Sequence, residues 1–288
     1  YGMSFAGDPT GPPACFFTKR YLAQVSDEHL VETVEDEGPV EVTAGLLVIG
    51  DEILSGRTQD ANLAFLGKEL GSRGIRLMEA RVIPDNEAVI VSALREARAR
   101  FDYVFTTGGI GPTHDDITVD CVAKAFDVPV VVHPKARQIL EDYYGARINE
   151  ARLRMARVPE GADLVENPVS MAPGIQLDNV YILAGVPRIM QGQFFSLAPG
   201  LRGGLPRLAR NIPAEVAESE VAPALEALEA RHDGVDIGSY PWMRHGRIGT
   251  SLVLRGTDAA QLDRVADELV AILAKLGIQT QAYEGEGG

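Results

Sequence analysis

The chain has 288 residues, of which 45% are hydrophobic and 24% are charged. This balance is typical of a globular protein and excludes a disordered chain, a collagen and a membrane bundle, because the longest apolar runs fall far short of the roughly 20 residues that span a bilayer. The net charge of −14 repels phosphate backbones, so we expect neither a nucleic-acid partner nor a membrane partner.

The cysteine content and the N-terminal sequence predict a cytoplasmic location. Cys15 and Cys121 are too few for a disulfide framework or a cysteine zinc site, and they fit a reducing compartment. No basic stretch followed by a long apolar run opens the chain, so we expect no signal peptide. We interpret Cys121, which lies in a helical pattern, as a small core residue rather than a nucleophile.

Residues 1–43 differ in composition from the rest of the chain. They contain eight acidic residues against Lys19 and Arg20, with four prolines and no sustained period. This composition predicts a mostly disordered acidic extension. An autoinhibitory or partner-binding role of the extension stays open as the alternative.

From residue 44, apolar strand patterns alternate with helical patterns. This alternation predicts an α/β domain over residues 44–204, in which a parallel-rich sheet lies between two layers of helices. The expected strands cover residues 45–49, 75–83, 101–107, 128–132 and 180–184. The expected helices cover residues 60–73, 86–100, 117–126, 134–144, 149–156 and 189–197.

The alternation of strand and helix patterns changes after residue 204, where glycines and prolines cluster. A β-α-β-β-α order follows, which predicts a smaller ferredoxin-like α+β domain with a split βαβ arrangement over residues 205–280, and residues 281–288 form a tail. The expected strands are residues 212–217, 235–240 and 247–254, and the expected helices are residues 223–231 and 258–276.

Three strand-to-helix loops of the first domain combine glycines with polar side chains: residues 50–61, 107–118 and 185–188. Right-handed crossovers place all such loops at the carboxyl edge of a parallel sheet. We therefore expect these three loops to line one crevice.

The second loop carries the strongest signal, TTGGIGPTHDDIT over residues 106–118. Its glycines let the backbone approach a ligand, and we expect the bare amides of residues 108–111 to hold an oxyanion beside the start of a helix. The carboxylates of Asp115 and Asp116 would repel that anion, so a divalent cation such as Mg²⁺ is expected between Asp116 and the phosphate. The open alternative is that both acids only cap the helix. His114 is a further candidate ligand contact.

The first and third loops supply polar groups at the same edge. The first, GDEILSGRTQDAN over residues 50–62, could bond a polar heterocycle and add a metal ligand, or Asp60 could be a helix cap and the glycines plain turns. In the third, Pro187 stands near a helix start. Arg188 either reaches a phosphate or is a solvated surface cation.

These two long strings resemble the molybdopterin-binding domain family, which includes molybdopterin adenylyltransferases, the competence/damage-inducible protein A family and the N-terminal part of eukaryotic FAD synthases. The likeness covers roughly residues 44–200, and SYPWMRHGRIGTSLVLRG over residues 239–256 resembles the second half of the FAD synthase portion. The resemblance implies that a pterin phosphate or a nucleotide binds to the following residues: Gly50, Asp51, Glu52, Asp60, Thr107, Gly108, Gly109, Gly111, Pro112, Thr118, Gly185 and Pro187.

The resemblance also implies metal-dependent chemistry at Asp116, with Asp115 as the second catalytic candidate and Asp51 as the second metal ligand. Some relatives hydrolyse ADP-ribose or FAD at the pyrophosphate with a divalent metal, Mg²⁺ or Co²⁺. Too few residues follow for an amidase or an adenylyltransferase domain, so we expect neither nicotinamide nucleotide deamidation nor FAD synthesis. Thr113-His-Asp-Asp also departs from the pattern of molybdopterin adenylyltransferases.

Three hypotheses follow from the sequence. The chain is a metal-dependent pyrophosphatase, a non-catalytic module that binds molybdopterin or a nucleotide, or an interaction protein that uses its acidic extension. The first two share a small phosphate-bearing ligand. The family resemblance also implies a homo-oligomer.

Overall fold

The computed structural model describes residues 41–244, 246–280 and 284–286. The predicted acidic extension with its partner-binding role lies outside the described residues, apart from residues 41–43, and so does most of the predicted tail. Strand β1 (Val42–Ile49) already contains two residues that the sequence assigned to the extension. None of the described helices combines the length and the apolar character that a membrane crossing requires.

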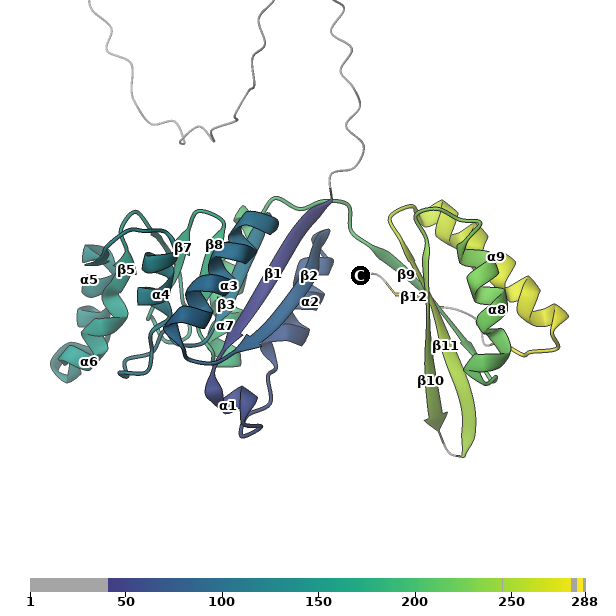
Figure 1. The fold of residues 1–288 in the computed structure, drawn as a ribbon, viewed down its shortest axis with the longest axis horizontal. Coiled ribbons are helices and arrows are strands. Elements are labelled where there is room, and N and C mark those ends of the chain that lie inside the picture. The colour runs from purple at the N-terminus through teal and green to yellow at the C-terminus, as the bar shows by residue number, and fades with distance from the viewer. Residues whose placement is uncertain (1–40, 245, 281–283, 287–288) are drawn as a thin grey trace, which may run out of the picture. The chain divides into compact units, whose positions relative to one another are not determined.

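Six strands form the main sheet of the first domain, in the order β2-β1-β3-β8-β7-β6 (Figure 1). The first four are mutually parallel, β7 is antiparallel to β8, and β6 is antiparallel to β7. Besides β1, the strands are β2 (Ile75–Ile83), β3 (Tyr103–Thr107), β6 (Asp163–Val165), β7 (Gly174–Leu177) and β8 (Val180–Leu183).

Helices cover both faces of this sheet, which confirms the predicted three-layer α/β domain (Figure 1). Side chains of β1 alternate between the faces: Leu47 and Ile49 pack with α3 and α4, whereas Leu46 and Val48 pack with α2 and α7. A strand buried on both faces needs an unbroken apolar run, which this sequence has. The helices are α2 (Asn62–Gly71), α3 (Glu87–Arg100), α4 (Thr118–Ala125) and α7 (Pro187–Leu197).

The segment between α4 and β6 departs from the predicted sheet. The expected strand at residues 128–132 is β4 (Val130–Val132), and it pairs with β5 (Arg157–Pro159) in a separate two-stranded sheet. An apolar run predicts a strand but not its partner, so its placement in the main sheet was wrong. Between these strands lie α5 (Pro134–Tyr144), η1 (Gly145–Arg147), α6 (Glu150–Leu153) and η2 (Arg154–Ala156), so the helix expected at residues 149–156 is a short α-helix continued by a 3₁₀ turn.

The second domain is the predicted split βαβ arrangement. Its sheet has the order β10-β11-β9-β12, in which every neighbouring pair is antiparallel. Apolar residues of both central strands and both helices form one core under the sheet. The elements are β9 (Leu208–Ala214), α8 (Glu218–Glu229), β10 (Asp236–Arg244), β11 (Arg247–Gly256), α9 (Ala259–Lys275) and β12 (Glu284–Glu286).

Candidate functional site

A cleft of about 590 Å³ lies where the three glycine-containing loops of the first domain meet. Each loop follows the carboxyl end of a parallel strand, so the loops converge as the crossover rule requires. The structure therefore brings together segments that are far apart in the sequence. The lining residues from the three loops, with Ala184 directly before the third, are Glu52, Thr58, Gly108, Gly109, Ile110, Gly111, Pro112, Asp116, Ala184, Gly185, Val186 and Pro187.

The glycines at the end of β3 have conformations and surroundings that exclude a side chain. Gly108 and Gly109 have φ values of +102° and +66°. A Cβ on Gly108 would lie 2.1 Å from the carbonyl oxygen of Ile49, and a Cβ on Gly185 would lie 3.2 Å from the Cα of Gly108. The backbones of the second and third loops are thus in direct contact at the floor of the cleft.

The amides of this loop differ in their availability. The N–H of Gly108 donates to the carbonyl of Leu183 at 3.2 Å, so this amide is not free to bind an anion, contrary to the expectation from the sequence. Within the described part of the chain, the amides of Gly109, Ile110 and Gly111 have no hydrogen-bond acceptor. Three adjacent unpaired donors that line a cleft are a suitable anion site.

Two predicted binding threonines lie beneath the loop. Thr118 is fully buried, and its hydroxyl and its amide donate to the carbonyls of Gly108 and Gly109, both at 3.0 Å. Thr107 is also buried, and no described atom is a partner for its hydroxyl. Neither residue lines the large cleft. Thr118 therefore holds the loop in shape, and the structure does not place it against a ligand.

The two adjacent acids take different positions. Asp116 lines the cleft, and its Oδ2 accepts the N–H of Thr113 at 2.8 Å and also the hydroxyl of Thr113. Asp115 is exposed and lies outside the cleft lining. Helix α4 has no side-chain cap at Ile117, so the alternative that either acid caps this helix was wrong. Asp116 instead closes the turn that precedes the helix.

The first loop is tied to the third by a residue that the sequence analysis did not select. Asn62 is 3% exposed, and its Nδ2 donates to the carbonyl of Gly185 at 2.9 Å. Asp60 accepts the N–H of Leu63 at 2.9 Å, which agrees with its interpretation as a helix cap. Gly50 precedes the short helix α1 (Asp51–Leu54), which contains Glu52. Asp60 and Asn62 line a small pocket of about 60 Å³ that shares Glu52, Thr58, Gly185 and Pro187 with the cleft.

Asp85 is a second acid that sequence reasoning undervalued. It follows β2 at the same sheet edge, and its Oδ2 accepts the N–H of Asp51 at 3.0 Å. Burial raises the pKa of Asp85, and the nearby carboxylates of Asp51, Glu52 and Asp115 raise it further. The signal was present in the sequence as an acid directly after an apolar strand, but Asp85 was considered only as a cap of the next helix, a role that Asn86 takes.

We expect Asp85→Asn to stabilise the protein at neutral pH. An asparagine can still accept the N–H of Asp51, while it removes a charge that the folded state disfavours. Because the folded pKa is raised, the gain is absent below the unfolded pKa of about 3.9 and grows as the pH rises through the folded value. Because Asp85 is partly exposed, solvent screening keeps this gain small. Urea unfolding of both proteins at neutral pH and near pH 4 measures it, and an unchanged or lower stability at neutral pH contradicts it.

The acids do not form a complete metal centre on their own. Among the described residues, no group of three or more histidine, cysteine, aspartate or glutamate side chains is arranged to hold a metal ion. Mg²⁺ in nucleotide sites commonly takes one or two carboxylates and completes its coordination with substrate phosphates and water. Asp116, which lines the cleft beside the free amides, fits that pattern. Asp51 is exposed and does not line the cleft.

Other candidate residues from the sequence lie elsewhere. His114 and Arg188 are exposed and lie outside the cleft lining. Cys121 is fully buried on α4, and burial raises the pKa of its thiol to about 12, which confirms its interpretation as a core residue. The wall of the cleft opposite the glycine loop comes from the segment between β4 and β5, and sequence reasoning did not select its lining residues, Tyr144, Arg152 and Met155.

Comparisons with known proteins agree with this architecture. A family model described as "Probable molybdopterin binding domain" matches residues 45–203, and one described as "FAD synthase, middle domain" matches residues 206–282. A protein from Pyrobaculum calidifontis is 36% identical over 211 residues, which cover 69% of this chain and 80% of that protein.

CinA-type proteins are also similar to this chain. A CinA-like protein from Myxococcus xanthus is 32% identical over 214 residues, covering 67% of this chain, and the match spans 50% of that protein's length. The crystal structure of a CinA protein of unknown function from Thermoplasma acidophilum has a TM-score of 0.52 and 34% identity, and it covers 55% of this chain and 96% of its own. These matches confirm the resemblance seen in the two loop strings, and the chain belongs to the molybdopterin-binding domain family, of the CinA type.

Proposed function

We propose that the cleft binds the phosphate group of a pterin, such as molybdopterin, or of a nucleotide. The observation that carries this proposal is the row of unpaired amides at Gly109, Ile110 and Gly111, which lines the cleft. Such amides bind an oxyanion without side-chain cations, so the site is compatible with the strongly acidic chain. A homo-oligomeric state and a cytoplasmic location stay predictions from the sequence.

We further propose that the bound compound is a dinucleotide such as ADP-ribose or FAD and that its pyrophosphate is hydrolysed. Asp116 supports this step, because Thr113 occupies only its Oδ2 and leaves Oδ1 as an acceptor beside the amides. A divalent ion such as Mg²⁺ or Co²⁺ would supply Lewis-acid chemistry there. The amides of the glycine loop would hold one phosphate still, and Asp116 would orient the attacking water.

A non-catalytic binding module is the second candidate function. It is favoured by the lack, among the described residues, of a preformed group of three metal-ligating side chains. The glycine loop alone is sufficient for binding, and it requires no general base.

One experiment separates these functions. The full chain is titrated by calorimetry with AMP, ADP-ribose and FAD, and release of AMP from ADP-ribose or FAD is followed with Mg²⁺ or Co²⁺. Metal-dependent release of AMP supports the pyrophosphatase, and tight binding without turnover supports the binding module. Failure of all these compounds and of a pterin phosphate to bind would overturn the proposed function.

A further inference from the structure

Three arginines, Arg152, Arg154 and Arg157, line the cleft or the small cavity beside it, and two of them are engaged. Arg157 forms an ion pair with Asp120. The guanidinium of Arg152 donates to the carbonyl of Arg147 and lies 4.4 Å from the ring centroid of Tyr144. Both groups are therefore satisfied by the protein itself.

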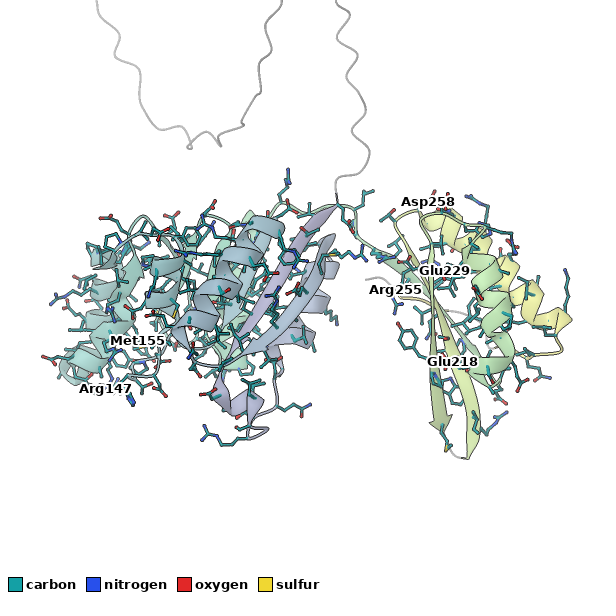
Figure 2. The ribbon with its side chains drawn as sticks, viewed as in Figure 1. Arg147, Met155, Glu218, Glu229, Arg255 and Asp258 are labelled. Atoms are coloured by element: carbon teal, nitrogen blue, oxygen red, sulfur yellow. The ribbon has the colours of Figure 1, made fainter. Side chains whose placement is uncertain are left out.

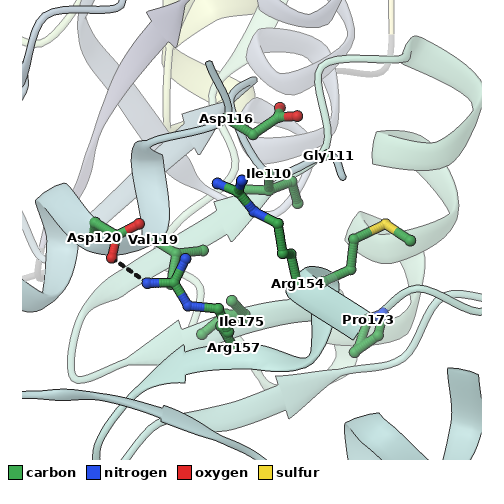
Figure 3. A pocket seen from close by; sticks show the side chains of 10 residues that line it. Ile110, Gly111, Asp116, Val119, Asp120, Arg154, Arg157, Pro173 and Ile175 are labelled. Atoms are coloured by element: carbon green, nitrogen blue, oxygen red, sulfur yellow. Dashed lines mark hydrogen bonds and ion pairs between the residues drawn. The ribbon is translucent and has the colours of Figure 1, made fainter. Parts of the chain in front are cut away.

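Arg154 is different. It lies in the 3₁₀ turn η2 and is half-buried, and within the described part of the chain its guanidinium has no hydrogen bond, ion pair or ring contact. It lines a small cavity together with Ile110, Gly111 and Asp116 (Figure 3). Figure 3 shows its guanidinium beside Ile110 and below Asp116, and the interaction drawn in this cavity joins Arg157 to Asp120.

An unpaired guanidinium in this position is costly for the folded state. Arginine keeps its charge at every relevant pH and offers five donors, so partial burial without a partner loses hydration and gains nothing in return. Both carboxylates that line the cavity are engaged elsewhere: Asp116 accepts hydrogen bonds from Thr113, and Asp120 pairs with Arg157. A bound anion would supply the missing partner of Arg154.

Two separate anion-binding features thus lie next to each other. The free amides of Gly109–Gly111 line the cleft, and Arg154 lines the small adjoining cavity, which shares Gly111 with the cleft. Tyr144 also lines the cleft, and since the guanidinium of Arg152 covers one face of its ring, a ligand would use the other face. A planar base stacks well on such a ring.

We infer that Arg154 is a specificity-determining residue that binds a second phosphate, so the cleft selects a nucleoside diphosphate group over a monophosphate, with the base against Tyr144. This inference rests on the proposed function and deepens it. The amides hold the first phosphate, and because they are neutral they do not favour a diphosphate over a monophosphate. The preference for a diphosphate comes from the charged guanidinium of Arg154.

The test is calorimetric titration of the full chain with AMP and ADP, in the wild type and in Arg154→Gln. We expect the wild type to bind ADP more tightly than AMP. Arg154→Gln should lower the affinity for ADP by about 10- to 100-fold, the range for a hydrogen bond to a charged group. The affinity for AMP should change by less than about 3-fold. Arg154→Lys, which keeps the charge, should recover part of the loss.

Arg147→Gln is the matched control. Arg147 lies on the same segment, is exposed and does not line the cleft; Figure 2 labels it. Its replacement removes the same charge and should leave both affinities unchanged. A Tyr144→Leu variant should weaken ADP by about 10-fold while leaving inorganic pyrophosphate unaffected, because only ADP carries a base. Thermal melts check that every variant is folded.

The outcomes separate this inference from the proposed function. Equal affinities of the wild type for AMP and ADP, or equal losses of both in Arg154→Gln, would overturn the role of Arg154 and leave phosphate binding at the glycine loop standing. If neither AMP nor ADP binds to the wild type, the inference fails, and the nucleotide form of the proposed function fails with it.

Discussion

Replacing Asp116 with asparagine is expected to reduce the metal-dependent release of AMP from ADP-ribose by about 100-fold or more, the scale on which loss of one charge-stabilising group acts in a closed site. Asp116 is the carboxylate that lines the cleft beside the unpaired amides. Asparagine is nearly the same size and keeps an oxygen that can accept the N–H of Thr113, so the turn should still close. The variant therefore removes charge with little change in shape.

The measurement is steady-state turnover with saturating Mg²⁺ or Co²⁺, together with calorimetric binding of ADP-ribose. Asp142→Asn is the control, because Asp142 is exposed on α5, does not line the cleft and loses the same charge. If Asp116→Asn turns over normally, Asp116 has no part in the chemistry. Loss of both folding and activity would instead assign Asp116 to the turn alone.

Gly108→Ala should destabilise the folded state by more than about 3 kcal/mol and abolish ligand binding. A left-handed conformation costs a residue with a Cβ about 1–2 kcal/mol. The new Cβ would also lie 2.1 Å from the carbonyl oxygen of Ile49, which is backbone and belongs to the central strand β1. Relief of that clash would separate β1 from β3, and the cost of overpacking adds to the conformational term.

A matched variant isolates the clash from the conformation. Gly161 has φ of +83°, and an added Cβ would meet no atom within 4 Å, so Gly161→Ala should cost only about 1–2 kcal/mol. Urea unfolding gives both free energies, and calorimetry gives the binding. Equal destabilisation by the two substitutions would show that β1 yields to the side chain of residue 108, which contradicts the close approach of these strands.

Local patterns were sufficient to predict most of the elements of the first domain. The apolar run of residues 45–49 predicts a strand that is buried on both faces. The glycines after residue 107 predict a turn with positive φ. Both features depend on residues that are close in the sequence. The crossover rule then places the three loops at one edge without any knowledge of side chains. The pairing of residues 130–132 with 157–159 was not predictable, because an apolar run does not identify its partner.

The site residues likewise fall into those that the sequence predicts and those that only the tertiary structure shows. The sequence by itself determined which segments line the cleft, namely the glycine loop, the acidic first loop and the strand end at Gly185. Only the tertiary structure decided that the amide of Gly108 donates to the carbonyl of Leu183, that Thr118 lies beneath the loop, and that Arg154 lines the cavity beside the cleft with no partner among the described residues. The physical reason is that hydrogen-bond satisfaction and burial depend on groups far along the chain, whereas turn conformation and periodicity depend on near neighbours.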